Sequence, residues 1–295
     1  MTFTVAASLD DALAGLAAGA RPIAGGTDLV VGARQGKAPL PGDIIAIDRL
    51  EELAGIDVGA DATRIGSGVT HARLMTDAAV VDGFTAIADA AALVGSPATR
   101  NVGTLGGNVM NGSPAMDTGA PLVVLDAKAE LTSTSGSRLV GMDELWTGPG
   151  RTSADPAELC TALVLPNFSG GSAYVRLEYR RAMEIAVVGA AAAVTLDGDS
   201  ISSIRVALTA VAPTIIEVTG LDALAGSSAA ASLDAVAAAA AEQATPISDL
   251  RASDAYRRHT IGVMARRAVD AAARRAAGET IAVPVNRALG IGAAS

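Results

Sequence analysis

Two glycine-rich stretches hold the residues of this sequence that are best suited to binding a phosphate. The longer stretch runs from Asn101 to Asp117 as NVGTLGGNVMNGSPAMD, and the shorter one is AGGTD at residues 24–28. Glycine lets another molecule approach the main chain closely, and successive N–H groups in such turns form a concave site for an anion. No lysine or arginine lies between Thr104 and Asp117, so a phosphate there would be held by amides and hydroxyls. The alternative is two ordinary surface turns, in which these residue types are common.

Two loops of this kind can hold an extended diphosphate from both sides. Neither loop has the G-x-G-x-x-G spacing of a Rossmann fold, and neither ends in the Gly-Lys-Ser/Thr of a P-loop. A dinucleotide site in this chain must therefore rest on a different fold.

Hydrophobic periodicity predicts the elements that position the shorter loop. Strands are expected at residues 3–5, 21–24 and 44–47, and helices at 9–16 and 29–35. Together they form a small β-α-β-α-β unit with Gly25 and Gly26 at the carboxyl end of a strand. The dipole of the helix that begins at Leu29 would help to hold a phosphate.

The pattern of predicted elements changes twice along the remaining chain. Short strands and turns predominate from residue 56, a helix is expected at 84–94, and a strand at 158–165 precedes Pro166. We place a domain boundary at 167–172, where Gly170 and Gly171 make a flexible joint. Three strands and then two helices are expected beyond it, at 173–179, 187–196, 201–210, 233–243 and 254–277. The arginine pairs of the last helix form no single basic stripe, so we expect them to face solvent or a partner.

The composition argues for a soluble acidic protein without nucleic-acid or metal chemistry of its own. The net charge of −9 leaves no basic surface for nucleic acid. The single cysteine, Cys160, allows no intramolecular disulfide and no cysteine-ligated iron–sulfur or zinc site. The two histidines, His71 and His259, lie far apart in sequence and indicate no metal site. We recognise no signal peptide and no membrane span, so a cytoplasmic protein is expected.

The two loops together resemble a known pair of motifs. Residues 24–28 (AGGTD) and 104–108 (TLGGN) are similar to the two FAD-diphosphate loops of the flavoprotein subunit of molybdenum hydroxylases. That subunit is the medium subunit of the carbon monoxide dehydrogenase and xanthine dehydrogenase families. The likeness continues, in the same order, through GSGVTH at 66–71, PAMD at 114–117, LVLP at 163–166 and RRAMEIAVVG at 180–189. It covers nearly the whole chain.

The resemblance implies an α+β fold in two domains. An FAD-binding domain of the PCMH type would occupy residues 1–168, with a small β-α-β unit at about 1–55 and a mixed α+β unit at 56–168. A C-terminal domain resembling that of the carbon monoxide dehydrogenase flavoprotein would occupy 172–290, with a three-stranded antiparallel sheet and helices.

The resemblance also implies which residues bind the cofactor, and it implies no catalytic residue and no metal ligand. The diphosphate would be held by Ala24, Gly25, Gly26, Thr27 and Asp28 on one side and by Gly103, Thr104, Gly106, Gly107 and Asn108 on the other. Asn111 and Asp117 would bond the ribityl or phosphate region, and apolar contacts would come from Ile23, Leu29, Val94, Leu159 and Cys160. Arg176 stands where relatives often carry a lysine near the flavin, and a cation there would stabilise the reduced, anionic ring. Arginine is not equivalent to lysine in such a role.

Several of these residues have simpler alternatives. Asp117 could cap the helix that follows it, and Arg176 could be a plain solvated side chain. His71, which follows Thr70 at a helix start, is expected to be structural, and Cys160 is expected to be inert core. Glu184 could shape the ring pocket or pair with Arg180 or Arg181.

The function implied by the resemblance is electron transfer through FAD. Neither glycine loop contains histidine, cysteine or tyrosine, so the FAD is expected to be non-covalent. A large subunit would hold the molybdopterin site and a small subunit two [2Fe-2S] clusters, as a dimer of heterotrimers. With one cysteine, the chain cannot hold the additional [4Fe-4S] cluster of one family branch. The alternatives are a stand-alone FAD-dependent oxidase, for which we identify no general base, and a scaffold that has lost the cofactor.

Overall fold

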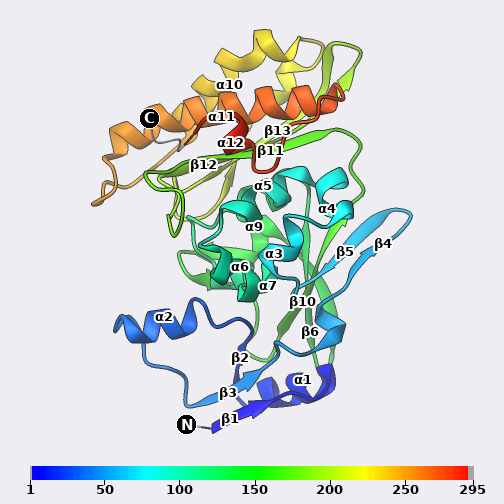
Figure 1. The fold of residues 1–295 in the computed structure, drawn as a ribbon, viewed down its shortest axis with the longest axis vertical. Coiled ribbons are helices and arrows are strands. Elements are labelled where there is room, and N and C mark those ends of the chain that lie inside the picture. The colour runs from blue at the N-terminus through cyan, green and yellow to red at the C-terminus, as the bar shows by residue number, and fades with distance from the viewer. Residues whose placement is uncertain (1, 292–295) are drawn as a thin grey trace.

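A small parallel sheet forms the N-terminal part of the computed structural model, which describes residues 2–291 (Figure 1). Its strands lie in the order β1-β3-β2, with bounds Thr2–Val5, Asp43–Ala46 and Arg21–Ile23. Helix α1 (Leu9–Ala17) is capped by the side chain of Ser8 and buries Leu13 and Leu16 in one cluster with Ile45. Helix α2 (Leu29–Arg34) follows β2, so the predicted β-α-β unit is present. Met1, the first residue of the predicted FAD-binding domain, lies outside the described residues.

A five-stranded antiparallel sheet forms the second part. Its order is β4-β5-β10-β6-β7, with bounds Ile56–Val58, Ala62–Gly66, Leu159–Pro166, Lys128–Ser133 and Gly136–Gly141. The central strand β10 is almost entirely buried, which fits its continuous apolar sequence. A 3₁₀ turn, seven short helices and a small hairpin complete this part: η1 (Glu51–Leu53), α3 (His71–Leu74), α4 (Ala78–Gly83), α5 (Thr85–Leu93), α6 (Pro97–Val102), α7 (Leu105–Asn111), α8 (Gly119–Val124), α9 (Met142–Leu145), β8 (Trp146–Gly148) and β9 (Arg151–Thr152).

The glycine-rich stretch 101–117 is more helical than its residue types suggested. Its first residues complete α6, which begins at Pro97 under the side-chain cap of Ser96. Helix α7 begins after Thr104, whose hydroxyl accepts a hydrogen bond from the backbone of Gly107, and ends at Gly112 in the left-handed conformation. Caps at both ends therefore outweigh the low helix propensity of the two glycines inside α7.

The C-terminal part is a second antiparallel sheet covered by helices (Figure 1). Three long strands, β11 (Gly171–Leu177), β12 (Val188–Asp197) and β13 (Ser200–Thr209), match the predicted three, and the two-residue strand β14 (Ile216–Glu217) adds to the edge of β13. The helices are η2 (Leu221–Leu224), α10 (Ala229–Gln243), α11 (Asp254–Ala276) and α12 (Val285–Ala288). Helix α11 packs so closely on β11 that a Cβ atom on Gly171 would overlap the carbonyl of Ala272. The α+β class predicted from the sequence is confirmed.

Buried arginines join the C-terminal part to the second part. Arg275 of α11 donates to both oxygens of Asp89 on α5, at 2.6 and 3.1 Å, and both side chains are almost inaccessible. Asp89 also accepts hydrogen bonds from the backbones of Tyr174 and Val285. Arg257, from another predicted solvent-facing pair, is 3% exposed and donates to the carbonyl of Val187. The expectation that these arginines face solvent or a partner was wrong for Arg257 and Arg275. Each is buried against carboxylate or carbonyl acceptors that are distant in sequence, so the helix alone gave no sign of the contact.

Within residues 2–291, no helix combines the length and the apolar character that crossing a membrane requires.

Candidate functional site

The two glycine loops lie in direct backbone contact. The first follows β2 and leads into α2, and the second begins at the junction of α6 and α7 and continues into the first turn of α7. A Cβ atom placed on Gly25 would fall on the carbonyl group of Val102, closer than non-bonded atoms can approach. The side chain of Asn111 adds a second link, because its amide donates to the carboxylate of Asp28 at 3.3 Å. Only glycine at position 25 permits this contact, which brings together residues that lie nearly eighty positions apart.

The first loop presents backbone donors that the protein leaves free. The N–H groups of Gly25, Gly26, Thr27 and Asp28 have no hydrogen-bond acceptor anywhere in the described part of the chain. Gly26 is in the left-handed region with φ of 67°, which turns the loop sharply. Adjacent amides of this kind, at the start of a helix, form a binding site for a phosphate or diphosphate.

The second loop uses most of its backbone donors within the protein, and two of them bond to residues 66–71. The backbone N–H of Leu105 bonds to Val69 and that of Gly106 to Ser67, at 2.9 and 2.8 Å. The N–H of Gly107 is taken by the hydroxyl of Thr104. Gly106 lies so close to Ser67 that a Cβ atom would clash with its backbone and side chain. The second loop therefore shapes the site, whereas the first loop supplies the free amides.

Asp117 and Arg176 form a buried pair between the second and C-terminal parts. The Asp117 carboxylate accepts hydrogen bonds from Arg176 Nη1 at 2.7 Å and from the hydroxyl of Tyr174 at 2.8 Å. Arg176 is completely buried and also donates to Glu178 at 3.0 Å. Burial, with the negative charge of Asp117, raises the pKa of Tyr174 well above its usual range. Both oxygens of Asp117 are thus engaged within the protein.

This pairing overturns two of the simpler alternatives. Arg176 is not solvated, and Asp117 does not cap α8, whose N-cap residue is Thr118. Their contacts with a cofactor, predicted by resemblance, stay predictions. The sequence could not reveal the pair, because its members come from different parts of the fold.

The segment after β11 reaches back toward the second glycine loop. The N–H of Met183 bonds to the carbonyl of Gly95 at 2.9 Å, and the carbonyl of Glu184 accepts from Arg176. Glu184 also forms an ion pair with Arg180 at 3.5 Å, which confirms the pairing alternative. Residues 180–185 therefore lie against the helix pair that carries the second loop.

The remaining predicted contacts differ in exposure. Ile23, Ala24, Leu29 and Val94 are half-buried beside the loops. Leu159 and Cys160 are buried in β10. Burial raises the pKa of Cys160 to about 12, so its thiol is inert at neutral pH. Asn108 accepts a hydrogen bond from the hydroxyl of Thr118 at 2.6 Å, which fixes its side chain.

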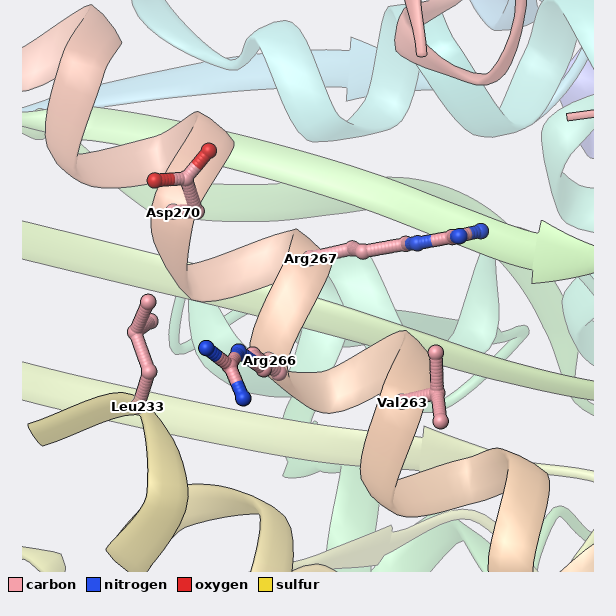
Figure 2. Close-up of a pocket in the computed structure, with 5 residues that line it drawn as sticks. All are labelled: Leu233, Val263, Arg266, Arg267 and Asp270. Carbon is pink, nitrogen blue, oxygen red and sulfur yellow. The ribbon is translucent and has the colours of Figure 1, made fainter. Parts of the chain in front are cut away.

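A hollow elsewhere on the molecule is unrelated to these loops. It lies between α10 and α11 and is lined by Leu233, Val263, Arg266, Arg267 and Asp270 (Figure 2). Figure 1 places these helices at the opposite end of the molecule from α2. None of the residues predicted to bind a cofactor lines it.

Two protein families match the chain, one in each half. The family described as the FAD binding domain in molybdopterin dehydrogenase matches residues 1–168, more than half of the chain. The chain belongs to this flavoprotein family. The family described as the CO dehydrogenase flavoprotein C-terminal domain matches residues 173–272.

Named relatives of the same flavoprotein family extend the likeness over nearly the full length. The xanthine dehydrogenase FAD-binding subunit of Escherichia coli is 33% identical over 282 residues, covering 93% of this chain and 96% of the relative. The carbon monoxide dehydrogenase medium chain of Afipia carboxidovorans is 32% identical over 268 residues, covering 87% and 90%. A structure of carbon monoxide dehydrogenase from Hydrogenophaga pseudoflava matches with a TM-score of 0.88 at 30% identity, covering 94% and 98%.

The family membership confirms that the chain is an FAD-binding oxidoreductase subunit. The geometry fits this cofactor, because the first loop has four free backbone N–H groups and a diphosphate needs hydrogen-bond donors. The individual contacts predicted for the two loops stay predictions.

Proposed function

We propose that this chain is the electron-transferring flavoprotein subunit of a molybdenum hydroxylase. It receives electrons from [2Fe-2S] clusters on a small partner subunit and passes them to an external acceptor. A large partner subunit holds the molybdopterin site where the substrate is oxidised, and the complex is a dimer of heterotrimers. The observation that carries the proposal is the pair of contacting glycine loops with free amides at Gly25–Asp28.

The chain's own residues bind and orient the cofactor. The amides of the first loop hold the diphosphate, and the second loop, fixed on residues 66–71, closes the other side. Bound FAD supplies a centre that accepts electrons from one-electron carriers and delivers them to one- or two-electron acceptors. Because neither loop contains histidine, cysteine or tyrosine, the binding is non-covalent.

The division of labour among subunits follows from the cysteine content. Cys160 is the single cysteine of the chain, and it is buried in β10. An iron–sulfur cluster needs several thiolate ligands, so the clusters that feed this flavin lie on another chain.

The test is electron flow in the purified complex, compared with a complex whose flavin has been removed. Xanthine and carbon monoxide, which the names of relatives indicate, are the first substrates to assay. A substrate that reduces the clusters in both complexes, but reduces an external acceptor only when FAD is bound, would support the relay. FAD that turns over a substrate on this chain alone would contradict it and favour a stand-alone oxidase. A purified chain that cannot bind FAD would contradict both.

A further inference from the structure

The imidazole of His71 lies at the junction of the two glycine loops. His71 is the first residue of α3, is 2% exposed, and donates its backbone N–H to the carbonyl of Gly103 at 3.0 Å. A Cβ atom on Gly103 would lie 3.4 Å from Cδ2 of the His71 ring and 3.6 Å from the Thr27 hydroxyl oxygen. The ring therefore lies against Gly103 of the second loop, and the hydroxyl of Thr27 in the first loop approaches the same residue.

The two nitrogens of this ring have different surroundings. Nδ1 is sealed from solvent and has no hydrogen-bond partner in the described chain, whereas Nε2 is not among the sealed, unpartnered atoms. Nε2 is bonded to Cδ2, the ring atom that faces Gly103. A proton on Nδ1 would find no acceptor, so the proton is better placed on Nε2, at the edge that faces the loops.

A hydrogen bond from one ring nitrogen to a carbonyl or carboxylate is a common way to fix the orientation and tautomer of a buried histidine. Buried polar atoms without any partner are rare. The His71 side chain makes no such bond to residues 2–291, so packing alone does not explain a histidine here.

The surroundings of the ring keep it neutral and favour an anion nearby. Burial, together with the positive charge of Arg100, lowers the pKa of His71 to about 4. Arg100 lies on α6 and donates to the carbonyl of Val94 at 3.0 Å, and it has no carboxylate partner in the part of the chain that the structure describes. A neutral ring with Nε2–H beside an uncompensated cation suits a phosphate oxygen as acceptor.

We propose that His71 is a third contributor to the FAD-diphosphate site, donating Nε2–H to a phosphate oxygen beside the free amides of Gly25–Asp28. This inference rests on the proposed function, since it assigns a residue to the same site. It differs from the sequence-based expectation, in which His71 was structural.

The test compares FAD binding by the full chain and its variants after removal of the cofactor. His71→Phe keeps a ring of similar size but removes the N–H donor, and we expect it to weaken FAD binding about 10-fold. His71→Gln places an amide N–H in a similar position and should retain most of the affinity. His259→Asn, which changes the exposed second histidine on α11, is the matched control and should bind FAD as the wild type does.

A second readout reports on the ring directly and needs no variant at the site. Nitrogen NMR of ¹⁵N-histidine-labelled chain, assigned with His259→Asn, should show His71 protonated on Nε2. Adding FAD should shift the Nε2 resonance more than the Nδ1 resonance. If His71→Phe has a lower Tm without FAD, this wild-type spectrum decides between structural and binding roles.

The outcomes separate this inference from the proposed function. Wild-type affinity in His71→Phe, or an Nε2 resonance that FAD leaves unchanged, would overturn the role of His71 and leave the flavoprotein function intact. A wild-type chain that does not bind FAD would instead refute the proposed function.

Discussion

Replacing Gly25 with alanine should separate the two glycine loops. The added methyl group would occupy the space of the Val102 carbonyl, which is backbone and cannot rotate away as a side chain can. Gly25 is not in the left-handed region, so backbone strain does not contribute and the effect is purely one of space. Relief requires the first loop to move away from residues 102–103.

The size of the effect follows from the cost of overpacking. Inserting a methyl group where there is no room costs about 1–3 kcal/mol, and a clash with backbone belongs at the upper end. If the loops separate to relieve this cost, about 3 kcal/mol is lost from FAD binding, which weakens the affinity by about 10²-fold. If the loops stay together, the same cost appears as a lower free energy of unfolding.

The assay is a titration of the FAD-free chain with FAD, combined with thermal unfolding of the free chain. Gly32→Ala is the matched control: Gly32 lies in α2, and an added Cβ would meet no atom within 4 Å. Alanine there should leave FAD binding unchanged and slightly favour the helix. A Gly25→Ala chain with the affinity and the Tm of the wild type would show that the two loops do not make the contact described here.

Two other predictions concern buried charge. Asp89→Asn removes the carboxylate partner of the buried Arg275 and should lower the free energy of unfolding by about 3 kcal/mol, measured by urea denaturation. Asp234→Asn breaks an exposed pair with Arg266 and should cost less than about 1 kcal/mol, and equal losses in the two variants would contradict this reasoning. In the FAD-free chain, the pKa of His71 is about 4 when folded and 6.5 when unfolded, so the unfolded chain takes up a proton first as the pH falls. His71 should therefore lower the free energy of unfolding by about 3 kcal/mol between pH 6.5 and 4, and His71→Phe should remove this contribution from the decrease.

The sequence was informative where local residue types determine structure. Apolar runs such as the one in β10 identified strands, and the motifs of the two loops pointed to the FAD-binding family to which the chain belongs. Ser8 and Ser253 cap α1 and α11, the helices expected at 9–16 and 254–277. The caps of α6 and α7 were overlooked, because the glycines between them suggest turns more strongly than the single Thr104 suggests a helix start.

Contacts between distant residues account for what the sequence did not reveal. Asp117 and Arg176 are 59 residues apart, and Asp89 and Arg275 are 186 apart, so no local pattern indicates that they pair. His71 gave no functional signal for the same reason, since Gly103, which its backbone and ring contact, comes from another segment. Residue type and spacing can indicate which groups could act, whereas tertiary packing determines which groups meet.

The contact between Gly25 and Val102 has a thermodynamic consequence for how the chain matures. The first loop follows a strand of the three-stranded sheet, and the second loop belongs to the part with the five-stranded sheet. A ligand bound by both loops would therefore hold these two parts of the chain together. FAD at about 100 times its Kd would stabilise the state in which both loops are in place by about 2.7 kcal/mol. Amide hydrogen exchange along β1–β3 should therefore slow when FAD binds, while exchange in the C-terminal sheet changes less. The two parts of the chain would then become rigid relative to each other only after FAD has bound.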